Sequence, residues 1–291
     1  MSIDIYRGLL KMFEVFDVFE PSSDNNLHFS YEFMNDNLFM LNDSYKINTI
    51  AGSGDDLKKA INILEWVSEN IHHKGNYDGS LSNNSITLLN YSYQAGQERG
   101  INCRSLSTIL TECCLSIGIN ARTIHIMLCS PYDGDNHVIT SVYVKELRKW
   151  IMLDPTYNCY FRDIESNVLD MFEVRKILSE KGNVKFNEAV NYNGYKYDGI
   201  YTEILEYFTK NLFYFWCREH NTFGSDDGKG GRMIICSPFG YSVQKAKEIN
   251  LHWRICQQGG YKEYMSILKE EISEEKIRMS KNDFMNPPIH P

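Results

Sequence analysis

A helix followed at once by three strands is the feature that most limits what this sequence can fold into. Residues 102–117 carry apolar side chains at helical spacing, and Gly118 is a residue type at which helices commonly stop. Stretches rich in β-branched residues follow at 121–128, 137–144 and 150–154, separated by turn-forming residues. Consecutive strands joined by short loops pair antiparallel. The sequence therefore predicts an α+β fold in which this helix packs on an antiparallel sheet.

Helical patterns dominate the chain on the C-terminal side of this unit. The predicted helices span residues 167–182, 200–220 and 241–258. We divide the sequence into an N-terminal extension over residues 1–56, a core over 57–165 and a mostly helical extension over 166–291. Because no linker separates these parts, we expect them to pack into one compact unit.

Composition and charge exclude several classes of partner. The chain is 43% hydrophobic and 23% charged, as is usual for a globular protein. Its net charge of −8 argues against a nucleic-acid partner, since phosphate binding needs a basic face. No apolar run is long enough to cross a bilayer, and the N-terminal stretch lacks the features of a signal peptide. We therefore expect a cytoplasmic protein with no membrane partner.

The eight cysteines are expected to be reduced thiols, because the sequence carries no export signal. Their spacing includes no C-x-x-C pair, and Cys113 and Cys114 are adjacent, which argues against a structural zinc site. No calcium-binding loop is present in the sequence. The sequence thus indicates neither a metal nor an organic cofactor.

Cys103 stands at the start of the predicted helix, a position that suits a nucleophile. A free thiol, with a pKa of roughly 8.5, is mostly protonated at neutral pH. Unpaired N–H groups and the macrodipole at a helix N-terminus favour the thiolate, and a neighbouring imidazolium favours it further. Cysteine is also a common buried hydrophobic residue, so Cys103 can be assigned as a nucleophile only if a histidine lies beside it.

His137 and Asp154 stand where the predicted sheet would bring them to the start of that helix. His137 begins the strand 137–144, and Asp154 ends the next strand, just before Pro155. Antiparallel pairing of the two strands would set Asp154 beside His137. A carboxylate there would orient the imidazole and stabilise its charged form. The sequence therefore predicts a catalytic triad of cysteine, histidine and aspartate, each at the boundary of a helix or strand.

Three segments together resemble the transglutaminase-like superfamily, which has a papain-like core. They are GINCRSLSTILTECCLSIGINAR (100–122), GDNHVITSVYV (134–144) and KWIMLDPTYN (149–158). In the family, a cysteine at a helix start is followed by G-I-x-A-R, a strand-initial histidine and W-x-x-x-D-P-T. The resemblance covers residues 57–160. The flanking segments look like those of a bacterial cytosolic subgroup of cysteine acyltransferases and peptidases.

This resemblance implies acyl transfer through a thioester. The Cys103 thiolate would attack a carbonyl carbon, His137 would protonate the leaving group and then deprotonate the acceptor, and Asp154 would orient His137. The backbone N–H of Cys103 would supply one donor to the oxyanion. The second donor stays open among upstream residues. The candidates are Gln94, Gln97 and Tyr93.

Three residues near the triad are candidates for substrate binding. Arg104 follows the cysteine at a position where family members commonly have an aromatic or acidic residue, so its side chain would line the acyl site. Asp133 and Asp135 lie in the loop before His137. They form either a solvated turn or an acceptor site that attracts an ammonium group.

Three other histidines and one arginine are interpreted as structural. His72, His73 and His125 fit surface or strand positions better than ligand positions. We expect Arg122 to pair with a carboxylate in the core and not to touch substrate. None of these four side chains is therefore assigned to the site.

Three functions stay open for such a site. The first is an acyltransferase or amide synthase, which moves an acyl group from a peptide, ester or carrier-bound thioester through Cys103 to a small amine. The second is a cysteine peptidase or amidase, in which water takes the acyl group. Both share the first half-reaction, so the motifs do not separate them. The third is a binding module on an inactive scaffold, and the intact triad counts against it.

Overall fold

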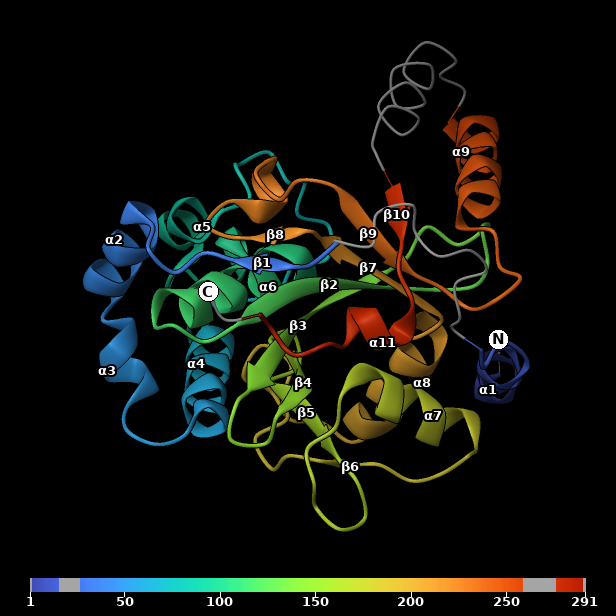
Figure 1. Ribbon diagram of the computed structural model, residues 1–291, viewed down its shortest axis with the longest axis horizontal. Coiled ribbons are helices and arrows are strands. Elements are labelled where there is room, and N and C mark those ends of the chain that lie inside the picture. Colours follow the sequence, from blue (N-terminus) through green and yellow to red (C-terminus); the bar gives the residue numbers. More distant parts are fainter. Residues whose placement is uncertain (1, 16–26, 259–275, 290–291) are drawn as a thin grey trace.

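A computed structural model describes residues 2–15, 27–258 and 276–289, and an eight-stranded sheet forms its centre (Figure 1). In spatial order its strands are β10 (Lys276–Arg278), β9 (Met233–Cys236), β7 (Tyr214–Arg218), β2 (Ala121–Met127), β3 (His137–Val144), β4 (Lys149–Asp154), β5 (Cys159–Arg162) and β6 (Lys185–Phe186). Neighbouring strands run antiparallel, apart from the parallel pair of β10 and β9. β1 (Ser30–Tyr31) and β8 (His220–Asn221) form a separate parallel pair.

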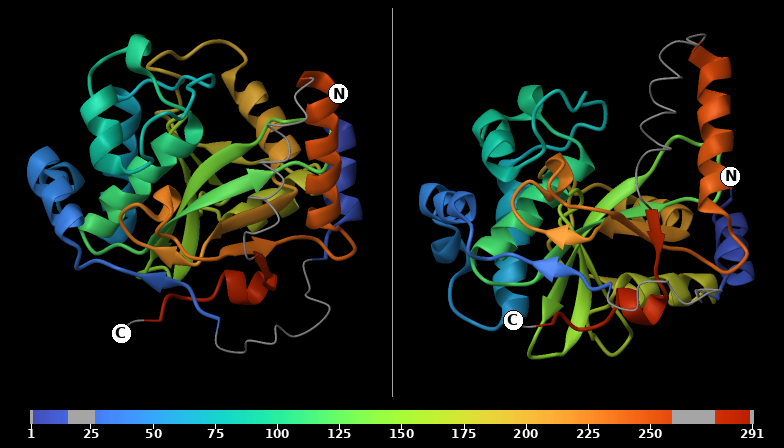
Figure 2. Two further views of the ribbon diagram at one scale, coloured as in Figure 1. Left: turned by 90° about the horizontal axis from the view of Figure 1, so that it is seen from above. Right: turned by 45° about the horizontal axis from the view of Figure 1, so that its top comes forward.

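Helices pack on both faces of the sheet, and each face has its own hydrophobic core (Figure 2). The helices of the first core are α2 (Asp36–Tyr45), α3 (Ile47–Ala51), α4 (Asp56–Asn70), α5 (Ser85–Ser92) and α6 (Cys103–Ser116). Those of the second core are α1 (Ile3–Met12), α7 (Met171–Ser179), α8 (Ile200–Asn211) and α11 (Lys281–Phe284). α9 (Val243–Gln258) stands near the β10 end of the sheet. Residues of the predicted N-terminal extension thus contribute to both cores.

The predicted helix and its three strands are all present, as α6 and β2 to β4. α6 begins at Cys103 because the side chain of Asn102 caps it, accepting a hydrogen bond from the Ser105 N–H at 3.0 Å. The helix packs against β2 and β3, which pair antiparallel. The expected α+β fold, with the cysteine-bearing helix on an antiparallel sheet, is confirmed.

Hydrogen bonds between buried hydroxyls and backbone carbonyls join the start of α6 to the start of β3. Ser107 Oγ donates to the Val138 carbonyl at 2.8 Å, and Thr140 Oγ1 donates to the Ser107 carbonyl at 3.1 Å. One turn further along, the hydroxyls of Thr111 and Thr140 lie 3.3 Å apart. Because these groups are buried, leaving any of them unpaired would be costly. The helix therefore cannot slide along the strand.

The pairing of β3 with β4 fixes the place of Asp154 relative to His137. Thr140 stands opposite Leu153. Continuing this register by one residue sets Asp154 opposite Ile139, which is two residues from His137 and on the same face of the sheet. Diagonal neighbours of this kind lie within reach of long side chains.

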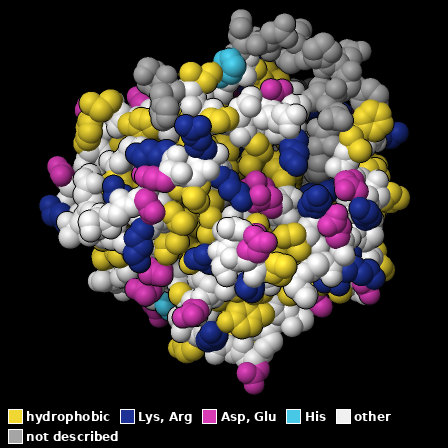
Figure 3. All heavy atoms as spheres, turned by 60° about the horizontal axis from the view of Figure 1, so that its bottom comes forward, with side chains coloured by type: hydrophobic (Ala, Val, Ile, Leu, Met, Phe, Trp, Pro, Cys, Tyr) yellow, Lys and Arg dark blue, Asp and Glu magenta, His cyan; other side chains and the backbone are white. Residues whose placement is uncertain are grey.

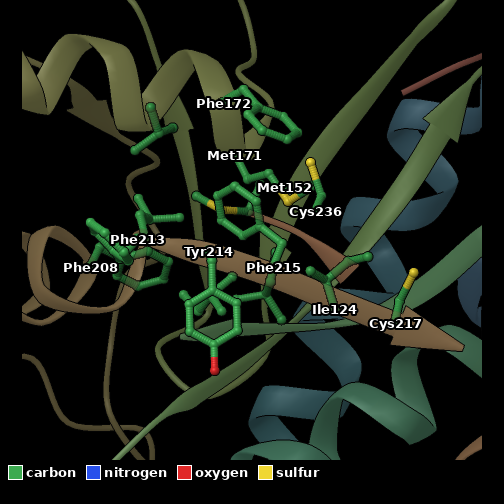
Figure 4. Packing of buried hydrophobic residues seen from close by; sticks show 14 of the residues in the cluster. Ile124, Met152, Met171, Phe172, Phe208, Phe213, Tyr214, Phe215, Cys217 and Cys236 are labelled. Carbon is green, nitrogen blue, oxygen red and sulfur yellow. The ribbon is translucent and has the colours of Figure 1, made fainter. Parts of the chain in front are cut away.

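Aromatic side chains fill the second core, and they reveal an error in the predicted helix over residues 200–220. Phe208 and Phe213 pack there with Phe215 and Met152 (Figure 4). α8 ends at Asn211, and β7 follows between β2 and β9. β7 has neighbours on both sides, and its residues are nearly all apolar, so they lack the alternation that marks a half-exposed strand.

Arg122 is fully buried, and its partners differ from the expected carboxylate. Its guanidinium carbon lies 4.0 Å from the ring centre of Trp150 and 4.4 Å from that of Phe29. Nη1 donates to the Phe284 carbonyl at 3.0 Å. Aromatic rings attract a cation through their negative faces, so rings take the place that a carboxylate was expected to fill. The contact also fastens the C-terminal helix α11 to the sheet.

Two observations concern the outer surface. Among the described residues, no helix combines the length and apolar character that crossing a bilayer requires. On the face shown in Figure 3, the described acidic and basic side chains are interspersed, with hydrophobic side chains between them. That face therefore presents a mixture of charges to a partner.

Glu112 of α6 joins three parts of the first core from a buried position. Its carboxylate accepts hydrogen bonds from the Ser85 N–H at 2.8 Å and from the Ser85 hydroxyl at 2.5 Å. Oε1 accepts another from the Gly224 N–H at 2.8 Å. Ser85 begins α5, and Gly224 precedes the short 3-10 helix η2 (Ser225–Asp227). Burial outweighs these hydrogen bonds and raises the pKa of Glu112 to about 7.

We expect Glu112→Ala to lower the free energy of unfolding at pH 5 by about 2–4 kcal/mol, because two buried N–H groups lose their acceptor. The loss should shrink as pH rises toward 7, since an unfolded glutamate releases its proton before the buried one does. Urea unfolding at both pH values measures the effect. The exposed Glu69 of α4 provides the control, Glu69→Ala, with an expected change below about 0.5 kcal/mol. Equal losses for the two variants would contradict the role of Glu112.

Candidate active site

Cys103 lies at the first position of α6, with its side chain half-buried. The N–H groups of the first helical turn point toward this end of the helix, and their positive field favours a thiolate there. All eight cysteines are free thiols. Buried ones such as Cys113 and Cys159 have a raised pKa because burial disfavours the thiolate. Cys103 therefore differs from them in its electrostatic surroundings.

His137 and Asp154 form a buried pair at the ends of β3 and β4. His137 Nε2 lies 3.1 Å from Asp154 Oδ2, and both side chains are 1% exposed. Asp154 Oδ1 accepts a hydrogen bond from the Thr156 N–H at 2.9 Å. The carboxylate is therefore held from two sides. Because the carboxylate pairs with the Nε2 atom of His137, the Nδ1 atom of the ring remains available to the thiol.

The thiol and the imidazole shift each other's pKa. Burial opposes ionisation of Cys103, but hydrogen-bonding interactions with His137 and His73 outweigh it and lower the pKa of the thiol to about 6. Burial also opposes protonation of His137, yet the charge of Asp154 and its hydrogen bond raise the pKa of the imidazole well above its ordinary value, with a smaller contribution from Cys103. At neutral pH, the favoured state is a thiolate beside an imidazolium.

Aromatic rings surround His137 and limit the ways in which it can turn. The ring centres of Tyr207, Phe208 and Tyr157 lie 5.1, 5.5 and 6.4 Å from that of His137, all at steep interplanar angles. Such edge-to-face contacts are favourable for aromatic rings. They hold the imidazole in place and shield it from water.

His73 stands beside the sulfur, although its sequence position suggested a surface or strand residue. It forms an isolated bridge with Ile101, two residues before the cysteine. Its hydrogen-bonding interaction with Cys103 is the second that lowers the pKa of this thiol. The residue lies in a polar loop with no helical or strand pattern, so no local signal in the sequence pointed to it.

The two glutamines considered as oxyanion donors are both exposed. Gln94 is exposed, and its amide nitrogen donates to Asn70 Oδ1 at 3.2 Å and to the Tyr93 hydroxyl at 3.4 Å. Its side chain is therefore turned toward the end of α4. Gln97 begins the 3-10 helix η1 (Gln97–Arg99) and is exposed.

Arg104 anchors a distant loop beside the candidate site. Its Nε donates to Asp226 Oδ2 at 2.9 Å, and its Nη2 donates to the Asp226 carbonyl at 2.6 Å. His125 Nε2 lies 3.6 Å from the same carboxylate, and the His125 ring stacks on Trp216 at 3.5 Å. Burial opposes ionisation of Asp226, but His125 and Arg104 outweigh it and lower its pKa. Two of the five N–H donors of Arg104 are thus used within the protein.

Asp133 and Asp135 already have an ammonium partner within the chain. Lys210 Nζ lies 2.8 Å from Asp133 Oδ2 and 2.9 Å from Asp135 Oδ2. The Tyr207 hydroxyl donates to Asp135 Oδ1 at 3.2 Å and to the Asn136 carbonyl at 3.1 Å. α8 therefore holds the loop that leads to the candidate histidine. This pairing counts against the two carboxylates as a site for a substrate amine.

A cavity of about 430 Å³ opens between this loop and α9. Its lining includes the rings of His125, Trp216 and Tyr241 together with Asn136 and Arg254. Within the described ranges, no three His, Cys, Asp or Glu side chains gather as they would around a metal ion.

Comparison with known proteins agrees with this arrangement. Residues 43–155 match the family model of the transglutaminase-like superfamily, which is less than half of the chain. These residues form a transglutaminase-like core, as the sequence motifs suggested, and this core supports a cysteine enzyme in general.

No curated protein matches the chain significantly. A solved structure from Cytophaga hutchinsonii, described only as a proposed cysteine protease, aligns at 20% identity with a TM-score of 0.30, over 60% of this chain and 57% of that chain.

We expect iodoacetamide to alkylate Cys103 before any other cysteine at pH 7. Its rate should rise with pH around a midpoint near 6 and then level off, because the thiolate is the reactive form. The exposed Cys256 is an internal reference, because it lies within α9 and not at the start of that helix. Peptide mass spectrometry measures both rates. A midpoint above pH 8 at Cys103 would contradict the ion pair.

Proposed function

We propose that the protein is a cysteine-dependent acyltransferase, which forms a thioester on Cys103 and passes the acyl group to an amine, making an amide. The observation that carries this proposal is the lowered pKa of Cys103 beside the His137–Asp154 pair. A thiolate at neutral pH is a strong nucleophile, and an imidazolium next to it can protonate a leaving group. The donors proposed are peptides, esters or carrier-bound thioesters.

Acylation uses the groups in a fixed order. The Cys103 sulfur forms a bond with the carbonyl carbon, and the π electrons of the carbonyl move onto oxygen. When the tetrahedral intermediate collapses, the bond to the leaving group breaks and His137 gives that group its proton. Asp154 keeps the ring of His137 in place and stabilises its charge before the transfer. The backbone N–H of Cys103 is one donor to the oxyanion.

Deacylation decides between an amine and water as the acceptor. Neutral His137 takes a proton from the incoming amine, whose nitrogen attacks the thioester carbon, and the Cys103 sulfur leaves as thiolate. The rings of Tyr157, Tyr207 and Phe208 shield His137 from water, and this shielding favours an amine as the acceptor over a water molecule.

The free cysteines fit a reducing compartment, so we propose that the protein is cytoplasmic.

The decisive test is the fate of an acyl group on Cys103. Incubation with p-nitrophenyl acetate should add one acetyl group to this residue, and added 1,4-diaminobutane should remove it as an amide. Mass spectrometry of the protein and of the small product follows both steps. Cys103→Ala should give no adduct, while Cys256→Ser should behave like the wild type. Loss of the acetyl group to water at an unchanged rate with diamine would make the protein a hydrolase, and no adduct would overturn the acyl-enzyme.

Asp154→Asn tests the support of His137. Asparagine keeps the Oδ1 acceptor for the Thr156 N–H but presents no charge to the imidazole. We expect the acylation rate to fall by about 10²- to 10⁴-fold, as when the carboxylate of a triad is neutralised. The pH midpoint for alkylation of Cys103 should also move upward, because the imidazolium is less stable. An unchanged midpoint would contradict the proposed coupling.

A further inference from the structure

His73 is brought to the start of α6 by a backbone pairing that only a small residue permits. The Ile101 N–H donates to the His72 carbonyl at 3.0 Å, and the Lys74 N–H donates to the Ile101 carbonyl at 2.7 Å. A Cβ atom on Gly100 would lie 2.9 Å from Lys74 Cβ and 3.0 Å from the His72 oxygen. Glycine at position 100 therefore lets the two segments come together two residues before the cysteine.

Two residues of a distant loop hold His73 in one orientation. The His73 N–H donates to Asn193 Oδ1 at 2.6 Å, and Asn193 Nδ2 donates to the His73 carbonyl at 3.1 Å. The ring nitrogen Nδ1 lies 2.9 Å from the Tyr192 hydroxyl. Burial raises the pKa of Tyr192, so its hydroxyl stays neutral and is able to donate a hydrogen bond to Nδ1. With the hydroxyl as donor, the proton of the neutral imidazole is on Nε2, which makes that atom a donor.

The two histidines belong to one cluster of rings around the sulfur. The ring centre of His73 lies 5.6 Å from that of Tyr192, which lies 5.5 Å from that of Tyr157. Tyr157 is in turn 6.4 Å from His137. His73 comes from the loop after α4 and His137 from β3, so the two imidazoles approach Cys103 from different elements.

Their partners suit the two histidines to different tasks. Asp154 carries a charge and stabilises an imidazolium at His137, as acid–base chemistry requires. The Tyr192 hydroxyl is neutral and only fixes the tautomer of His73. A fixed N–H beside the attacking sulfur is what an oxyanion hole needs.

We propose that His73 is the second oxyanion donor of the site, with its Nε2–H directed at the substrate carbonyl oxygen, and this rests on the proposed acyl transfer. As the sulfur–carbon bond forms, the carbonyl π electrons move onto oxygen, and that charge is shared between His73 Nε2–H and the Cys103 N–H. When the intermediate collapses, the electrons return to the carbonyl, and the leaving group takes its proton from His137. No proton leaves His73 at any step.

Two reagents separate this role from simple stabilisation of the thiolate. p-Nitrophenyl acetate acylates the sulfur through a tetrahedral oxyanion, whereas iodoacetamide alkylates it by direct displacement with no oxyanion at the carbon attacked. We expect His73→Leu to slow acetylation of Cys103 by about 10²-fold or more, as for loss of one oxyanion donor. Alkylation should slow less than tenfold at a pH where the thiol of each variant is fully ionised.

Matched variants control the comparison. His73→Gln, whose side-chain amide can still donate, should recover part of the acetylation rate, and Tyr192→Phe should lower it less than His73→Leu does. His72→Leu makes the same change one residue earlier in the same paired segment, and it should leave the ratio of the two rates unchanged. Circular dichroism checks that each variant is folded.

The outcomes distinguish this inference from the proposed function. If wild-type protein forms no acetyl-Cys103, both fail together. If the wild type is acetylated and His73→Leu slows acetylation and alkylation by the same factor, the acyl-enzyme stands and the oxyanion role of His73 is overturned. A fall in the ratio with His73→Leu but not with His72→Leu supports it.

Discussion

The site depends on how the start of α6 is held against the start of β3. Ser107 and Thr140 exchange hydrogen bonds with backbone carbonyls across this contact, and all of these groups are buried. A helix docked only by apolar side chains could shift by a fraction of a turn with little loss, because hydrophobic contact is non-directional. Directional bonds prevent this shift. They set Cys103 at the level of His137, and the shifts that these two residues cause in each other's pKa depend on this placement.

Much of the fold was predictable because its signals are local. The helix over residues 102–117 shows a clear periodicity, and the strands after it show β-branched runs broken by turns. His137 and Asp154 could be paired from strand order alone. β7 at 214–218 could not be recognised, because it lies between two other strands and its nearly all apolar residues show no alternation. His73 was missed for another reason, since its hydrogen-bonding partners lie about 120 residues away along the chain.

Polar side chains that were considered for substrate binding also hold the parts of the site together. Arg104 was expected to line the acyl site, yet it binds Asp226, a residue 122 positions later. Glu112, on the same helix, accepts hydrogen bonds from Gly224 in the same loop. Leaving a buried carboxylate without its hydrogen-bond donors is costly, so this loop and α6 form one unit. The chain beyond the transglutaminase-like core is therefore part of what shapes the site, although the family motifs end before it.

The identity of a ring nitrogen's partner decides what a histidine can do. At His137 the partner is a carboxylate, which favours the protonated ring and so allows a proton to be given and taken back. At His73 the partner is the neutral hydroxyl of Tyr192, which, as donor to Nδ1, would hold the N–H at Nε2 in place. If both histidines could transfer protons, the thiol could lose its proton to either of them. With one group that moves protons and one that only donates a hydrogen bond, proton transfer involves His137 alone, while His73 stabilises negative charge first on the sulfur and then on the substrate oxygen.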